Sequence, residues 1–277
     1  MKATKIIAVL AVALMAAGTV GLTSCKGKDK GKTASTKDAK GKKKGKAKKV
    51  ELPEDAFDVK FTEDESGCII TSFHGDSEAV EGNDVTFPST VQGLPVRGIN
   101  CIEDVYRAAS ITIPEGVEWI DENDAGKGTI KDGITSVKLP STLKIIGADT
   151  FSFVKSLSEC NLPEGLIYIG KGAFDCSGLK SVTLPSSLKV INYNAFGSCD
   201  SLEEINIPDG LVIMHNGPFE LFSGEKIEAS LGLQKTIKDM NHKRVDNENQ
   251  IRKILKDAGC SKDSFDATDV LYDDPWG

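Results

Sequence analysis

The residue types that most often perform catalysis or bind metals are few in this chain and lie far apart. The three histidines, His74, His215 and His242, fall in different segments and show no metal-ligand spacing. No Gly-x-Ser-x-Gly elbow, Cys-x-x-Cys pair or His-Glu-x-x-His helix is present. Carboxylates are abundant because the whole chain is acidic, with a net charge of −7, so a pair of them carries little information. The sequence predicts neither an enzyme nor a protein that holds a cofactor or a metal.

One cysteine has a context that indicates lipid chemistry. Lys2 and Lys5 precede an apolar run over residues 6–21, and a Leu-Thr-Ser-Cys sequence then ends at Cys25. This arrangement predicts a secretory signal peptide over residues 1–24. Its last four residues resemble the lipobox of bacterial lipoproteins, which implies that Cys25 becomes the acylated first residue and inserts in a membrane. Two or more acyl chains anchor a protein stably. The alternative is that the protein is secreted without a lipid anchor and that Cys25 has no role in anchoring it.

A basic segment follows Cys25. Residues 26–49 contain 12 Lys and two Asp, a net charge of +10, whereas residues 50–277 have a net charge of −19. A segment that repels itself and has nothing to bury stays disordered, so we expect residues 25–49 to be a lipid anchor and a Lys/Gly-rich tether. The tether could be a solvated linker, or it could attract an anionic envelope component or the acidic domain. Export argues against a nucleic-acid partner.

Six prolines recur at steps of 26, 26, 23, 22 and 23 residues, and each closes a tripeptide of apolar, polar and apolar residues. A period in the twenties is typical of a solenoid. The tripeptide has the alternation of a half-buried strand, and proline ends the strand because it has no N–H to donate. We therefore expect one short strand in each repeat, stacked in parallel on its neighbours. The prolines are Pro88, Pro114, Pro140, Pro163, Pro185 and Pro208.

Each repeat also carries an apolar pair, then a phenylalanine, then a leucine. Gly116, Gly165 and Gly210 stand two residues after a proline, which suits a turn that needs a positive φ. A degraded seventh repeat is predicted where Ile227 aligns with Ile205. The apolar positions are Val117/Ile120, Leu143/Ile146, Leu166/Ile169, Leu188/Ile191 and Leu211/Met214, then Phe151, Phe174, Phe196 and Phe219, then Leu157, Leu179 and Leu202.

Three further cysteines fall within the repeats. Cys160 takes a core position of a predicted strand, while Cys176 and Cys199 both follow a phenylalanine and were assigned the same position in the repeat. We expect all three to be buried packing thiols. A disulfide between Cys176 and Cys199 stays open at this stage, because stacking could bring the two side chains close.

These repeats resemble the BspA-type leucine-rich repeats of bacterial surface proteins, most closely over residues 162–185 and 184–208. The resemblance extends over roughly residues 57–237, and residues 124–129 depart from the pattern, which predicts a local loop there. It implies an α+β repeat fold, a leucine-rich-repeat solenoid with short parallel strands. It also implies a binding function, namely adhesion to a protein or glycan of a host or neighbouring cell.

The ends of the repeat domain have their own patterns. The domain is expected over residues 50–240, with an N-terminal cap at about 50–80 that contains a β-hairpin over residues 57–73. Residues 241–277 are expected to form a C-terminal helix and an acidic tail. The helix would begin after Asp246 and end at Gly259, with an apolar stripe that packs on the last repeat. The stripe is Ile251, Ile254, Leu255 and Ala258.

Two polar columns are expected on the outer side of the stacked strands, and they form the candidate binding face. Solenoids commonly bind ligands over such extended faces. The alternative is that small polar residues only keep the strands soluble and pair with one another. The first column is Thr86, Thr112, Lys138, Asn161, Thr183 and Asn206, and the second is Asp84, Ser110, Ser136, Glu159, Ser181 and Glu204.

The sequence thus predicts a lipid-anchored bacterial cell-envelope protein, on the outer membrane, which binds an unknown protein or glycan. Many surface-displayed bacterial lipoproteins carry acidic residues directly after the lipidated cysteine, whereas Lys26-Gly27-Lys28 is basic. Both the cell surface and the periplasmic face therefore stay open. The second hypothesis is a periplasm-facing structural lipoprotein that contacts peptidoglycan or envelope proteins.

Overall fold

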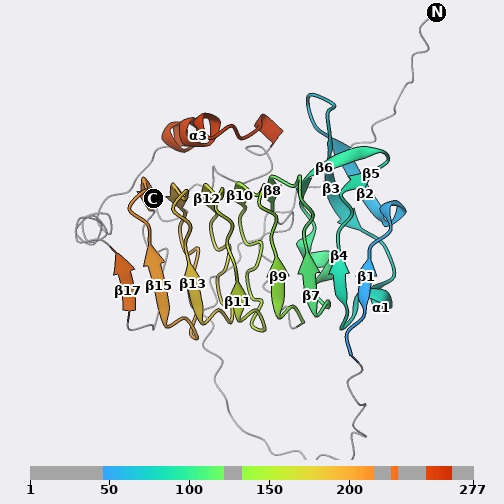
Figure 1. Ribbon diagram of the computed structural model, residues 1–277, viewed down its shortest axis with the longest axis horizontal. Helices are drawn as coiled ribbons and strands as arrows, with labels where there is room; N and C mark the ends of the chain where they lie inside the picture. The colour runs from blue at the N-terminus through green and yellow to red at the C-terminus, as the bar shows by residue number, and fades with distance from the viewer. Residues whose placement is uncertain (1–45, 122–132, 215–225, 230–247, 264–277) are drawn as a thin grey trace, which may run out of the picture. The chain divides into compact units, whose positions relative to one another are not determined.

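The computed structural model describes residues 46–121, 133–214, 226–229 and 248–263, all within the unit formed by residues 41–277 (Figure 1). Several predictions fall outside these ranges: the signal peptide, Cys25, most of the tether, residues 124–129, Phe219 and the acidic tail beyond Asp263. Within the described ranges, no helix has both the length and the hydropathy to cross a bilayer.

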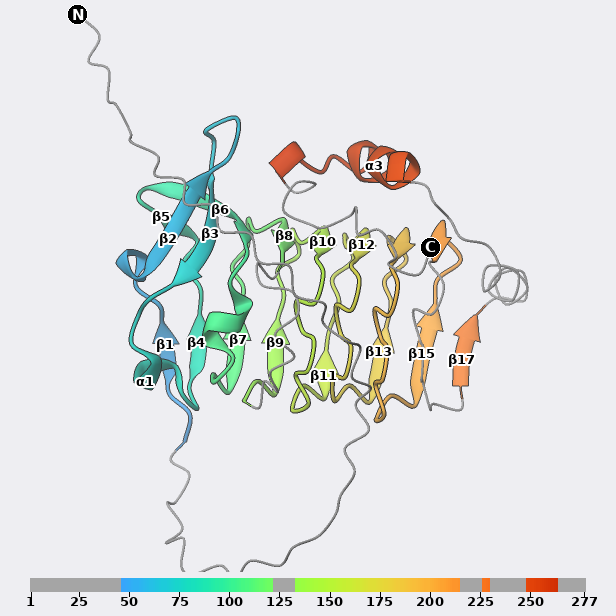
Figure 2. The same ribbon diagram turned by 180° about the vertical axis from the view of Figure 1, so that it is seen from behind.

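The proline-closed tripeptides form short parallel strands, which we call the first ladder (Figures 1 and 2). Their register is the predicted one: Val85 pairs with Ile111, and Val137 pairs with both Ile111 and Cys160. β17 confirms the seventh repeat, because Ile227 lies opposite Ile205. The strands are β1 (Lys49–Glu51), β4 (Asp84–Thr86), β7 (Ser110–Thr112), β9 (Ser136–Lys138), β11 (Glu159–Cys160), β13 (Ser181–Thr183), β15 (Glu204–Ile207) and β17 (Lys226–Ala229).

Two features of the first ladder were not predicted. Lys49, assigned to the tether, starts β1, which pairs with β4 so that Val50 lies opposite Val85. The ladder is also interrupted: β1, β4, β7, β9 and β11 form one sheet, and β13, β15 and β17 form another.

A second ladder runs along the opposite edge of each repeat, and the sequence indicated only its apolar pairs. It continues from the predicted hairpin, which is confirmed as β2 antiparallel to β3, and β3 pairs in parallel with β6. A short strand, β5 (Thr90–Val91), folds back on β6. The strands are β2 (Phe57–Phe61), β3 (Cys68–Phe73), β6 (Leu94–Ile99), β8 (Trp119–Ile120), β10 (Ile145–Ile146), β12 (Tyr168–Ile169), β14 (Val190–Ile191) and β16 (Ile213–Met214).

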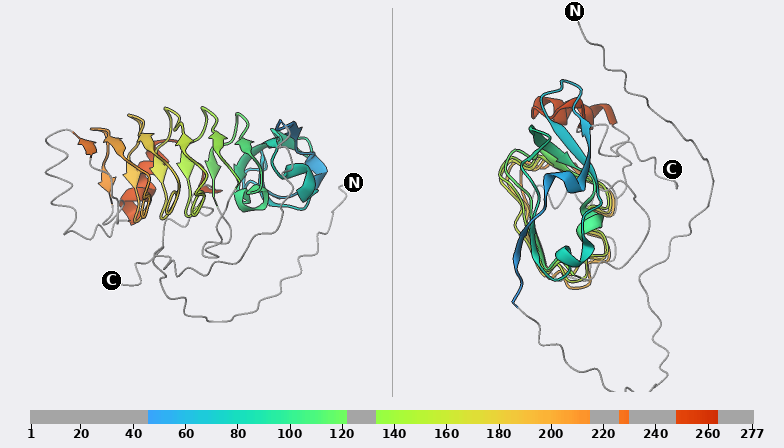
Figure 3. Two further views of the ribbon diagram at one scale, coloured as in Figure 1. Left: turned by 90° about the horizontal axis from the view of Figure 1, so that it is seen from below. Right: turned by 90° about the vertical axis from the view of Figure 1, so that its right-hand side faces the viewer.

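The core lies between the two ladders, and the repeats nearly superpose when viewed along the stack (Figure 3). Phe151, Phe174 and Phe196 are fully buried and stack, with ring centroids 5.3 and 5.2 Å apart. Offset stacking of this kind adds to the stabilisation that burial alone supplies. The remaining short elements are two 3-10 turns, η1 (Glu54–Ala56) and η2 (Ile102–Val105), and one helical turn, α1 (Ser77–Val80).

The turn after each phenylalanine corrects the alignment of the cysteines. Phe153, Cys176 and Ser198, each two residues after the phenylalanine, all have a positive φ, between 48° and 60°. Cys176 therefore matches Ser198, not Cys199. Cys199 is a free thiol whose Sγ lies 3.3 Å from Oγ of Ser177, so the disulfide between Cys176 and Cys199 does not form. Cys160, Cys176 and Cys199 are buried, as predicted.

The glycines after the prolines are explained by two different causes. Gly116 and Gly165 have φ values of +99° and +153°, as predicted. Gly210 lies outside the positive-φ region, and the prediction was wrong there. A Cβ at Gly210 would lie 2.9 Å from the carbonyl oxygen of Ser186, so the close approach of the preceding repeat requires glycine.

The C-terminal helix α3 (Glu248–Asp257) packs on the second ladder rather than on the last repeat, which corrects the prediction. Ile251 and Leu255 are buried against Trp119, Tyr168 and other outward residues of that ladder. Those outward residues are large and apolar, so their burial under the helix is favourable. Gly259, at φ +71°, ends the helix as predicted.

Paired turns join neighbouring repeats through what we call the Glu–Ser brackets. The Glu115 carboxylate accepts hydrogen bonds from the backbone N–H and the hydroxyl of Ser141, at 3.1 and 2.8 Å. Glu164 accepts the same two bonds from Ser186, at 3.4 and 3.0 Å. These bonds lower the pKa of Glu115. Turns with glutamate directly after the proline therefore alternate with turns that have serine at this position.

Candidate functional site: a polar depression on the first ladder

The structure places both polar columns where the sequence predicted them. Ladder pairing aligns Asp84, Ser110, Ser136 and Glu159 in one column, and Thr86, Thr112 and Lys138 in the other. Beyond the interruption, Ser181 lies opposite Glu204 and Thr183 opposite Asn206. The side chains in the middle of the face are exposed, namely Ser136, Lys138, Glu159, Asn161, Ser181 and Thr183.

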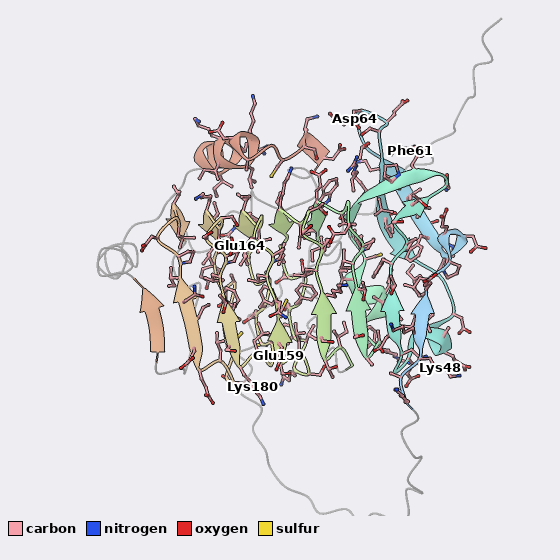
Figure 4. The ribbon with its side chains drawn as sticks, in the orientation of Figure 1. Lys48, Phe61, Asp64, Glu159, Glu164 and Lys180 are labelled. Carbon is pink, nitrogen blue, oxygen red and sulfur yellow. The ribbon has the colours of Figure 1, made fainter. Side chains whose placement is uncertain are left out.

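Four of the predicted face residues line one depression, of about 370 Å³, between β11 and β13. They are Glu159 and Asn161 on one side, and Ser181 and Thr183 on the other. Thr112, Ser136, Lys138, Glu204 and Asn206 lie elsewhere along the ladder. Glu164, beyond the end of β11, also lines the depression (Figure 4). The candidate binding face therefore contains one depression, between β11 and β13, among the strands that the structure describes.

The depression lies where the first ladder is interrupted, because β11 and β13 belong to different sheets. The backbone N–H of Lys180 still donates to the carbonyl of Ser158, at 3.3 Å, just before the two strands. The 22-residue step falls in the loop that leads into β13, where the turn is one residue shorter. Gly178 allows the short turn, because a Cβ there would lie 2.0 Å from the carbonyl oxygen of Lys155.

The depression offers mainly hydrogen-bond acceptors and hydroxyl groups. The Glu159 carboxylate is exposed and makes no hydrogen bond or ion pair with any described residue. Glu164 is partly engaged by its bracket with Ser186. Cys160 packs at the base, where burial raises the pKa of its thiol to about 12, so the thiol stays protonated at neutral pH. The surface suits a ligand that donates hydrogen bonds, such as an amine, a guanidinium or a sugar hydroxyl.

Asn206 has a structural partner that the sequence did not reveal. Its side-chain oxygen accepts a hydrogen bond from the backbone N–H of Leu184 at 2.8 Å, and its amide lies 3.4 Å from the Leu184 carbonyl. Asn206 thus joins two repeats on the far side of the depression.

The sequence missed Glu164, Pro185 and the depression itself. The signal that could have found them is the single 22-residue step between Pro163 and Pro185, since one missing residue must change how two neighbouring strands meet.

Two parallel ladders that face each other across coils of 22 to 26 residues define a leucine-rich-repeat solenoid. Residues 129–251 match the family described as the BspA type leucine rich repeat region, in six copies. These residues are BspA-type leucine-rich repeats, which confirms the resemblance seen in the sequence.

Solved structures agree with this fold. A leucine-rich repeat protein of T. pallidum superposes with a TM-score of 0.53 at 25% identity, over 70% of this chain and 97% of that one. The pneumococcal vaccine antigen PcpA superposes with a TM-score of 0.50 at 24% identity, over 64% of this chain and 48% of that one, and shows the fold alone. No curated protein is significantly similar to the chain.

Proposed function

We propose that the protein is a lipid-anchored component of the bacterial cell envelope that binds a protein or a glycan through the first ladder. The observation that carries the binding proposal is the depression between β11 and β13, which gathers four exposed polar residues of the predicted face. The BspA-type repeats support a binding or surface role. The lipobox-like sequence before Cys25 supports the anchor.

Replacement of Cys25 by alanine tests the anchor. We expect the wild-type chain in the membrane fraction of the expressing cells, with a mass raised by acylation. The Cys25→Ala chain should instead be soluble or remain as the unprocessed precursor, without acylation. An unchanged mass and an unchanged distribution of the Cys25→Ala chain would contradict lipidation at this residue.

Charge reversal tests the binding face. The full-length chain would be used to capture ligands from host-cell lysate and from a glycan array, with Glu159→Lys and Thr183→Lys as variants. Glu81→Lys is the matched control, because Glu81 is exposed and lies away from the depression. We expect the two depression variants to lose a ligand that the control retains. If all three chains retain every ligand while folded, the depression does not bind.

The second candidate is the periplasm-facing lipoprotein, which the basic Lys26-Gly27-Lys28 sequence favours. Protease treatment of intact cells distinguishes a surface-displayed lipoprotein from a periplasm-facing one. Surface display predicts cleavage on whole cells. A chain that survives on whole cells and is cut only after lysis would exclude a surface adhesin.

A further inference from the structure

Strand β2 forms the N-terminal end of the second ladder and has an open edge (Figure 1). It pairs with β3 on one side, and no strand within the described ranges pairs with its other side. An open edge presents backbone N–H and C=O groups that can pair with another strand. The edge of β2 is therefore an interaction surface separate from the depression on the first ladder.

The hydrogen bonds of the hairpin show which residues of β2 face this open edge. The Thr62 N–H donates to the Gly67 carbonyl at 3.0 Å, at the turn end of the strand. The register is regular from there back to Val59. Bonded and non-bonded positions alternate in an antiparallel pair, so Lys60 bonds to β3. The backbone groups of Val59 and Phe61 point towards the open edge and can bond to an added strand.

The side chains of β2 have unused capacity for contacts. Phe61, labelled in Figure 4, is 47% exposed, more than any other large apolar side chain that the structure describes. The Lys60 ammonium is exposed and makes no hydrogen bond or ion pair with a described residue. The Asp58 carboxylate accepts a bond from the Ser72 hydroxyl at 2.8 Å, and its side chain is still 71% exposed. An added strand would meet one apolar group and one charge of each sign.

The order of these residues makes β2 complementary to a second copy of itself. Residues 57–61 read Phe-Asp-Val-Lys-Phe, with one acid and one base at equal distances from the central Val59. In an antiparallel pair centred on Val59, Asp58 of each copy lies opposite Lys60 of the other. Opposite charges at facing positions stabilise a sheet, and like charges destabilise it. A lone lysine on an edge strand discourages pairing, whereas this symmetry makes the lysine attractive.

Charge also decides between β2 and the N-terminal edge of the first ladder, β1. Lys49 and Glu51 flank Val50, so β1 is self-complementary as well, over three residues. Its pairing would bring together two copies of the segment directly before it, residues 26–49, each with a net charge of +10. These two segments repel each other. β2 is longer, with five residues, and does not directly follow the basic segment.

We propose that the protein forms a two-fold symmetric homodimer in which the β2 edges of two copies pair antiparallel about Val59. Each copy presents the same surface, so the contact closes as a dimer and leaves neither β2 edge open. The nine-stranded sheet then continues from one copy into the other. The proposal does not depend on the depression or on the lipid anchor.

Disulfide trapping tests the register of this pairing. Facing Cα atoms at the non-bonded positions of an antiparallel pair lie about 4.5 Å apart, within the range that a disulfide bridges. Full-length Asp58→Cys and Lys60→Cys chains, purified in detergent and mixed under mild oxidation, should therefore form a mixed disulfide, while the second Lys60–Asp58 pair stays intact. Mass spectrometry of the linked peptides identifies it. The control mixes Lys60→Cys with Thr183→Cys, an exposed position on the first ladder. No mixed disulfide, or an equal yield in the control, overturns the proposal.

Charge reversal tests the attraction between the two strands. Asp58→Lys sets lysine opposite lysine, and Lys60→Asp sets aspartate opposite aspartate, so each variant alone should dimerise about tenfold more weakly than the wild type. An equal mixture of the two restores both opposite-charge pairs and should dimerise like the wild type. The doubly reversed chain should do so alone, which shows that the single variants still fold. Sedimentation velocity of the full-length chains in detergent measures the dimer. Single variants that associate as strongly as the wild type, or a mixture no stronger than its components, would overturn the proposal.

Discussion

The ammonium of Lys144 donates a 2.9 Å hydrogen bond to the carbonyl of Gly259, 115 residues further along the chain. This bond joins the second ladder to the C-terminal end of α3, where carbonyl groups lack helical partners and a cation is favourable. Lys144 also forms an ion pair with Glu118, at 3.3 Å, just before β8. One side chain therefore connects the helix with two neighbouring repeats of the second ladder.

Lys144→Ala should loosen α3 without unfolding the repeats. The hydrogen bond from Lys144 to the Gly259 carbonyl is exposed to solvent, so we expect a loss of only about 0.5–1.5 kcal/mol in the docking of the helix. Hydrogen exchange of the backbone amides of residues 248–257 measures this change in docking. The control is Lys253→Ala, since Lys253 is exposed and, within the part of the chain that the structure describes, pairs only with Asp257 of the same helix. Equal exchange in the two variants would show that Lys144 does not hold α3.

Phe174→Ala should destabilise the whole solenoid, because Phe174 lies in the middle of the phenylalanine stack. Loss of a buried phenylalanine costs about 3–5 kcal/mol in the free energy of unfolding. Urea denaturation measures the change. Val212 is 45% exposed, so Val212→Ala should change the free energy by less than about 0.5 kcal/mol. A loss below about 1 kcal/mol for Phe174→Ala would mean that the stack contributes little.

Cys160→Val should make the protein less sensitive to alkaline pH. Burial raises the pKa of the Cys160 thiol from 9.0 to about 12, so the folded chain retains a proton that the unfolded chain loses. The stability is present below pH 9 and falls as the pH rises towards 12. Valine fits the position, because Val137 lies opposite Cys160 in the ladder. Urea denaturation between pH 8 and 10.5 should show a shallower decline for Cys160→Val, and parallel curves would contradict the burial of a titrating thiol.

Glu115→Ala tests a Glu–Ser bracket. The bonds from Ser141 lower the pKa of Glu115, so the carboxylate stabilises the fold at pH values above 4.5 and less as the pH falls through the lowered value. We expect a lower thermal midpoint than the wild type at pH 7 and a smaller difference at pH 3. Glu81→Ala is the control, because Glu81 lacks a bracket. An equal difference at both pH values would show that the charge of Glu115 is not the cause.

The proline-closed strands of the first ladder could be predicted to the residue, since alternation and proline fix both the side that each residue faces and the end of each strand. Strand β1 and the interruption between β11 and β13 could not. Val137 lies opposite Ile111 because both precede a proline by three residues. The second ladder could not be predicted in the same way. From β8 to β14 its strands are two residues long and both residues are buried, as in Tyr168–Ile169, so they show no alternation.

Two aromatic residues in the sequence indicate where α3 packs. Trp119 and Tyr168 stand at outward positions of the second ladder, where an uncovered aromatic residue would face water. The depression depended on a difference of one residue between repeats, and the contact between the β2–β3 turn and the segment after α3 joins residues 200 positions apart, Glu63 and Asp263. Spacing along a single repeat cannot reveal contacts of that range.

The Glu–Ser brackets also limit how such a chain can change in length. A turn with glutamate, such as that of Glu115 or Glu164, bonds a turn with serine in the next repeat. Duplication of a repeat with glutamate would set two acidic turns side by side, so one carboxylate would lose its serine and meet a like charge. Duplication of a repeat with serine, or of a pair, leaves every existing bracket in place. Growth of this part of the stack by single repeats is therefore restricted to repeats with a serine turn, and an inserted repeat with a glutamate turn needs a serine repeat after it.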